Sequence, residues 1–154
     1  MTDQALRYQK EKEALKQAFE EKGDVARYLT CHTRLLESLI GKRAKSLHLP
    51  EDVALLAAGG FGRTEVFPFS DIDLLVLIPE HYPEQSAECV STFLTSLWDL
   101  GLSVGASVRT ARETLTDCTQ DIALSTNFLE ARFLYGNKEL FEATRAEYLS
   151  LIHI

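Results

Sequence analysis

The spacing of apolar residues predicts two helices at the start of the chain. Apolar side chains form a narrow stripe over residues 3–21 and recur more strongly, near 3.6-residue spacing, over residues 25–47. Gly23 ends the first segment, and Asp24 is placed to cap the second at its N-terminus. We therefore expect an N-terminal helical segment over residues 1–50.

Further along, short apolar runs alternate with helical patterns. Strands are predicted at Val53–Ala58, Ile72–Ile78 and Leu102–Arg109. One helical turn is predicted at Arg63–Phe67, and longer helices over residues 85–100 and near 111–117, 120–134 and 138–150. Trp98 is expected to anchor the helix over residues 85–100 in the core. The order predicts an α/β (α+β) fold with a small mixed sheet flanked by helices. Residues 51–154 would form its core, in a single compact domain overall.

Charge and composition narrow the classes of partner. Sixteen Lys and Arg against 23 Asp and Glu give a net charge of −7, which argues against a nucleic-acid partner. The first twenty residues are charged throughout, and the apolar runs are far shorter than the ~20 residues that a bilayer span needs. Three scattered cysteines without a CxxC pair are typical of reduced thiols. We expect a soluble, cytoplasmic protein with no membrane partner.

Two carboxylates begin the second predicted strand. Asp71 and Asp73 are two residues apart, so both side chains point to the same face of the sheet. Carboxylates that close repel each other, and a divalent cation removes the repulsion. Oxygen ligands of this kind favour Mg²⁺ or Mn²⁺. The alternative is that the two residues only decorate an exposed strand end.

A glycine-rich turn precedes this pair and favours the metal interpretation. Gly59 and Gly60 directly follow a buried strand, and the backbone N–H groups beyond them are typical of a phosphate-binding helix start. Arg63 and Ser70 add a guanidinium and a hydroxyl to the same group of ligands. A phosphate cradle facing a two-carboxylate metal site is what nucleotidyl transfer from a nucleoside triphosphate requires.

Two other glycine-loop motifs do not fit this turn. A Walker A loop ends in Gly-Lys-Ser/Thr, whereas Gly62 is followed by Arg63 and Thr64. A dinucleotide fingerprint needs Gly or Ala where Glu65 stands. We expect Glu65 to pair with Arg63 or to serve as an acid at a helix start.

The strings GGFGRTEVFPFSDIDLL (59–75), VGASVRT (104–110) and DIALSTNFLEARFLYG (121–136) resemble a known domain. It is the N-terminal nucleotidyltransferase domain of the bacterial PII uridylyltransferase/uridylyl-removing enzymes, in the polymerase-β-like superfamily. The resemblance implies that Asp71 and Asp73 are the catalytic metal ligands and that Gly59, Gly60 and Ser70 contact the triphosphate. It also implies UTP as donor and a tyrosine of the PII signalling protein, which acts in nitrogen regulation, as acceptor.

The chain departs from that pattern in two ways. Many superfamily members carry a third carboxylate on the strand matching Leu102–Arg109, whereas this strand has none, and Ala106 stands where a histidine is expected. Other candidates for the third carboxylate are Asp99, Asp117, Asp121 and Glu130.

The second departure is length, because the family enzymes add a phosphohydrolase domain and sensing domains. We expect a fragment of a longer enzyme, without uridylyl removal. Arg109 is left open between a phosphate contact and an ordinary surface residue. The alternatives are an adenylyl- or other nucleotidyltransferase of the superfamily, or a non-catalytic nucleotide-binding remnant.

Overall fold

The computed structural model describes residues 3–67 and 70–152, and it begins with a pair of helices. These are α1 (Asp3–Lys22) and α2 (Val25–Ser46). The carboxylate of Asp24 accepts a hydrogen bond from the Arg27 N–H at 3.1 Å, so the predicted helix cap is confirmed.

Four strands form one mixed sheet in the order β3-β2-β1-β4. They are β1 (Ala54–Ala57), β2 (Ile72–Ile78), β3 (Val104–Thr110) and β4 (Arg132–Gly136). β1 is antiparallel to both β2 and β4, whereas β2 and β3 run parallel, with Asp73 opposite Gly105. The predicted α/β class, a small mixed sheet flanked by helices, is confirmed.

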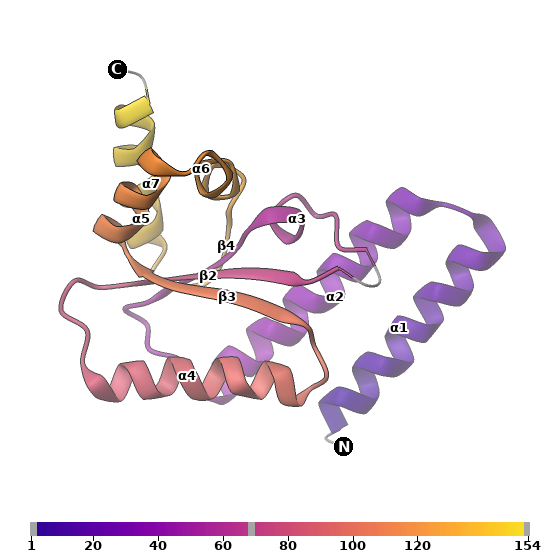
Figure 1. The fold of residues 1–154 in the computed structure, drawn as a ribbon. Helices are drawn as coiled ribbons and strands as arrows, with labels where there is room; N and C mark the ends of the chain where they lie inside the picture. Colours follow the sequence, from indigo (N-terminus) through magenta and orange to yellow (C-terminus); the bar gives the residue numbers. More distant parts are fainter. Residues whose placement is uncertain (1–2, 68–69, 153–154) are drawn as a thin grey trace.

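Helices cover both faces of the sheet (Figure 1). The remaining helices are α3 (Gly59–Gly62), α4 (Glu84–Asp99), α5 (Ala111–Gln120), α6 (Ile122–Leu129) and α7 (Lys138–Ile152). Alternate residues of β2 point to opposite sides, as the two-residue period of a strand requires. Leu74 and Val76 join the core beneath α1, α2 and α4, whereas Leu75 and Leu77 join the core beneath α5, α6 and α7. Asp73 therefore lies on the α5–α7 side.

Two sequence predictions about secondary structure are wrong. The helix predicted over residues 120–134 ends at Leu129, because residues 132–136 pair with β1 as strand β4. A backbone ladder to a distant strand overrides the local helical pattern there. The turn predicted at Arg63–Phe67 lies instead at the glycines of α3, where the Gly62 N–H donates to Ala58 O at 2.9 Å.

Trp98 does not anchor the core. The side chain is 52% exposed, and its Nε1 donates to Val104 O at 3.0 Å. Other apolar residues of α4, including Phe93 and Leu97, are fully buried against the sheet and occupy the place predicted for the indole. No helix within residues 3–67 and 70–152 has the length and apolarity of a membrane span.

Candidate functional site

Asp73 is held between two glycines. A Cβ on Gly59 would stand 2.5 Å from Asp73 Oδ2, and one on Gly105 would stand 3.5 Å from Asp73 Oδ1. Gly59 also has φ +53°, a left-handed conformation that side chains other than hydrogen disfavour. The absence of a side chain at Gly59 is therefore what lets this carboxylate lie directly against the first residue of α3.

Asp71 lies just before β2 and is exposed to solvent. Its Oδ1 accepts a hydrogen bond from Ser103 Oγ at 2.5 Å. Burial raises the pKa of Asp73, the charge of Asp71 raises it further, and the guanidinium of Arg63 acts in the opposite direction. The two carboxylates therefore repel each other at a half-buried position.

The turn α3 is joined to the strand that carries Asp73. The Ala58 N–H donates to Asp73 O at 3.0 Å, and the Arg63 N–H closes the turn by donating to Gly59 O at 3.1 Å. Because Gly59, Gly60 and Phe61 form the first turn of the helix, their N–H groups have no acceptor within it. These donors begin beside the Asp73 carboxylate.

Arg63 is tied to two acids. Its Nη1 donates to Glu130 Oε2 at 2.6 Å and its Nε to Glu65 Oε2 at 3.4 Å, so the predicted pairing with Glu65 is confirmed. The hydrogen bond to Glu130 is the main reason that the pKa of Arg63 is raised. The guanidinium is 43% exposed and acts electrostatically on Asp73.

Arg132 holds the end of α3 through hydrogen bonds, a role that the sequence did not predict. Its Nε donates to Gly62 O at 3.0 Å and its Nη2 to Phe61 O at 2.9 Å, which satisfies two carbonyls at the end of the turn. The same guanidinium pairs with Glu37 of α2. No local signal marks this role, because it depends on β4 lying beside β1.

The structure does not bring every predicted residue to one place. Gly59, Gly60 and Arg63 lie together in or directly after α3, and Gly59 touches Asp73. Ser70 is exposed and lines a separate hollow of about 220 Å³ whose walls include α1 and α2.

Each of the four candidates for a third carboxylate has another contact or lies exposed at a helix end. Asp117 pairs with Arg109, and Asp121 accepts from the N–H groups of Ala123 and Leu124 as the cap of α6. Glu130 pairs with Arg63, and Asp99 is exposed in the last residue of α4. On β3, Gly105 stands opposite Asp73.

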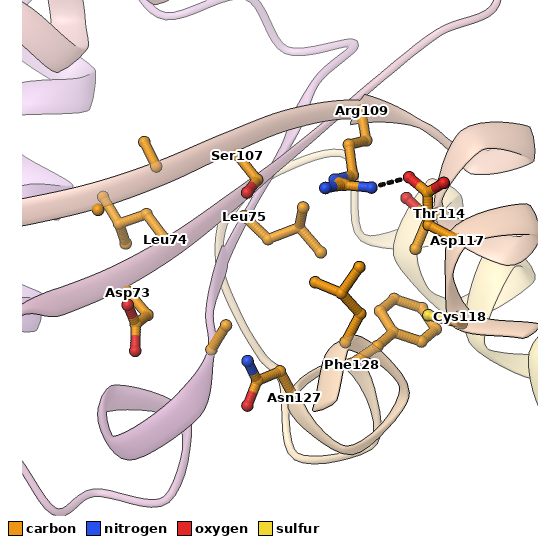
Figure 2. A pocket seen from close by; sticks show the side chains of 14 residues that line it. Asp73, Leu74, Leu75, Ser107, Arg109, Thr114, Asp117, Cys118, Asn127 and Phe128 are labelled. Carbon is orange, nitrogen blue, oxygen red and sulfur yellow. Dashed lines mark ion pairs between the residues drawn. The ribbon is translucent and has the colours of Figure 1, made fainter. Parts of the chain in front are cut away.

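A cavity of about 280 Å³ opens beside Asp73 and runs along the sheet. Its walls come from β2, β3, α5 and α6, and Figure 2 shows Asp73 at one end and the ion pair of Arg109 with Asp117 at the other. Arg109, which the sequence left open, therefore lies in a cavity rather than on an open surface.

The residues at β2 fit a divalent cation of the Mg²⁺ type. The carboxylates of Asp71 and Asp73 are hard oxygen ligands. Burial and then the charge of Asp71 raise the pKa of Asp73, and a cation would relieve both effects. Within residues 3–67 and 70–152 no group of three or more His, Cys, Asp or Glu side chains is arranged to hold a metal. The remaining coordination positions would therefore fall to phosphate oxygens and water.

No protein-family model matches the chain. Comparison with individual proteins finds relatives that share one name. The bifunctional uridylyltransferase/uridylyl-removing enzyme of Aromatoleum aromaticum is 39% identical over 140 residues, which are 91% of this chain and 16% of that enzyme. The enzyme of the same name from Cupriavidus pinatubonensis is 37% identical over 138 residues, 90% of this chain and 16% of that enzyme.

A solved toxin-antitoxin structure with AMP-PNP aligns with 73% of this chain and 86% of that chain, at 14% identity and a TM-score of 0.48. That similarity is too low to support a conclusion. The sequence identity to the two uridylyltransferase/uridylyl-removing enzymes is much higher. The chain spans only 16% of the length of each of these enzymes. The chain is a homologue of one segment of the bifunctional uridylyltransferase/uridylyl-removing enzymes.

Proposed function

We propose that this chain carries a metal-dependent nucleotidyltransferase site that transfers UMP from UTP to a protein hydroxyl, with release of pyrophosphate. The acceptor in this proposal is a tyrosine of a PII-type signalling protein. The observation that carries the proposal is the placement of the Asp73 carboxylate, beside Asp71, directly against the first residue of α3. That placement sets two metal-type ligands next to the first N–H groups of a helix, which have no acceptor within it.

Each part of the site has a role in this reaction. Asp71 and Asp73 would hold Mg²⁺ or Mn²⁺, which when bound neutralises the triphosphate and the charge that develops during transfer. The N–H groups of Gly59 and Gly60 donate to phosphate oxygens. Arg63 supplies a cationic fork once it exchanges Glu130 for phosphate. Arg132 keeps the turn fixed while this exchange takes place.

The test is incubation of the chain with labelled UTP, Mg²⁺ and a PII protein, followed by measurement of label on PII. Asp71→Asn and Asp73→Asn should each reduce transfer at least 100-fold, since loss of a metal ligand removes much of the charge stabilisation. Glu88→Gln, an exposed carboxylate-to-amide change on α4, is the matched control and should transfer at the wild-type rate.

The other outcomes are equally informative. Full transfer by the doubly substituted Asp71→Asn, Asp73→Asn chain would overturn the proposal. Preference for ATP when the four nucleoside triphosphates compete would replace uridylyl with adenylyl transfer. Metal-dependent UTP binding without any transfer would support a non-catalytic nucleotide-binding role, which the lack of a carboxylate on β3 favours.

A further inference from the structure

The cavity beside Asp73 has charged side chains at both ends and both apolar and uncharged polar side chains between them. Asp73 marks one end and the ion pair of Arg109 with Asp117 marks the other (Figure 2). The middle is lined by Leu75 and by the ring of Phe128, which is only 2% exposed. Apolar walls with a few polar groups at defined positions are typical of small-molecule pockets.

The cavity runs along β3 over a length that suits a nucleoside. Gly105, opposite Asp73, and Arg109 both line it and are four residues apart on the same strand. Strand rise makes this separation about 13 Å, comparable with the length of a nucleoside monophosphate. A molecule whose phosphate lay at Asp73 would therefore place its far end near Arg109. Ser107 and Asn127 line the stretch between and offer a hydroxyl and an amide.

The ion pair at the far end can still bind a ligand. A guanidinium has five N–H donors and a carboxylate has about four acceptor positions, so Arg109 and Asp117 retain free capacity beyond their mutual bond. Together they present a donor beside an acceptor. The uracil ring carries the complementary pair, an N–H beside a carbonyl oxygen, along one edge. The apolar side chains of Leu75 and Phe128, which line the cavity, suit the apolar faces of the ring.

We infer that this cavity binds the nucleoside part of the nucleotide and that Arg109 and Asp117 contact the edge of the base. The inference rests on the proposed function for the position of the phosphates, and it adds where the base lies and which residues contact it. Ser107 and Asn127 then face the ribose. The phosphate end and the base end are separate surfaces, so substitutions can affect one without the other.

The experiment measures binding of UTP and of inorganic tripolyphosphate, each with Mg²⁺, by titration calorimetry. Arg109→Met keeps an unbranched stem but removes the guanidinium and its donors, and it should weaken UTP binding about tenfold or more, the effect of losing one charge-assisted hydrogen bond. Tripolyphosphate binding should be unchanged. Ser107→Leu fills the cavity and should give the same pattern without altering any charge.

Val108→Leu is the matched control for Ser107→Leu. Val108 is the next residue on β3, is 41% exposed and lines a different hollow beside Trp98, so this variant should bind both ligands as wild type does. Thermal unfolding of each variant confirms that it is folded.

Three results separate the two proposals. Equal weakening of tripolyphosphate and UTP by Arg109→Met would show that Arg109 holds phosphate and would overturn the nucleoside assignment. Unchanged UTP binding in both Arg109→Met and Ser107→Leu would also overturn it, while leaving the proposed function intact. Metal-independent binding of tripolyphosphate, unaffected by Asp73→Asn, would instead overturn the proposed function.

Discussion

Replacing Gly59 by alanine should lower the stability of the fold moderately and the activity of the proposed site strongly. The new Cβ would stand 2.5 Å from Asp73 Oδ2, so the carboxylate has to move. The left-handed backbone at φ +53° costs a residue with a side chain about 1–2 kcal/mol. For a chain of this size that cost lowers the midpoint of thermal unfolding by about 2–8 °C. Under the proposed function, displacement of the Asp73 carboxylate by about 1 Å should lower the rate of UMP transfer about 100-fold.

Gly23→Ala is the matched control. Gly23 has φ +67°, but a Cβ there meets nothing within 4 Å. It should therefore lose a similar amount of stability, measured by thermal unfolding, and keep its UMP transfer to PII. The reasoning is refuted if Gly59→Ala transfers UMP as fast as Gly23→Ala does, because the clash with Asp73 would then have no effect on the site.

Further predictions concern the charge of Asp73, the metal proposed to bind there, Arg132 and Gly136. The pKa of Asp73 is higher in the folded chain than in the unfolded chain, so the unfolded chain loses this proton at a lower pH. The free energy of unfolding therefore falls as the pH rises from the unfolded-state pKa to the folded-state pKa. Asp73→Asn, without metal, should therefore unfold at a higher temperature than wild type at pH 7, a gain that disappears in acid where both are neutral. Mg²⁺ should stabilise wild type but not this variant in the same thermal assay, and an equal response would contradict the metal assignment. Arg132→Met should lower the free energy of unfolding by about 1–3 kcal/mol in urea titrations, because Gly62 O loses the guanidinium donor and Phe61 O keeps only the Thr64 N–H. A loss no larger than that of Arg7→Met, which breaks an exposed pair on α1, would count against this role. Gly136→Ala should abolish folding at ordinary temperature, as judged by circular dichroism, since its Cβ would overlap the backbone oxygen of Val53. A well-folded variant would show that β4 shifts easily.

The parts of the fold with strong local signals were predictable. Strand β2 is an apolar run bounded by Asp71 and Pro79, and its predicted bounds, Ile72–Ile78, are those observed. The helices α1 and α2 agree within one residue because Gly23 and Asp24 mark the break between them. In these segments the sequence pattern and the final packing require the same conformation.

The errors occur where distant contacts decide the conformation. Residues 132–136 have a helical pattern locally but complete the ladder on β1, which is some 75 residues earlier in the chain. The role of Arg132 and the cavity between β3 and α6 depend on that pairing or on the packing that follows from it. Residue types and spacing near Asp71 and Asp73 were enough to predict a candidate site. The residues that surround it could be identified only from the tertiary structure.

The position of β1 between β2 and β4 has a consequence for synthesis of the chain on the ribosome. β1 and β2 can pair as soon as residue 78 has emerged, but the other edge of β1 stays open until residues 132–136 follow. During that interval the nascent chain exposes the backbone of a fully apolar strand, Ala54–Ala57, to any other unpaired strand nearby. Arg132 reaches α3 in the same step that closes this edge. A nascent chain should therefore close the open edge of β1 and gain the Arg132 contacts to α3 at the same moment of translation.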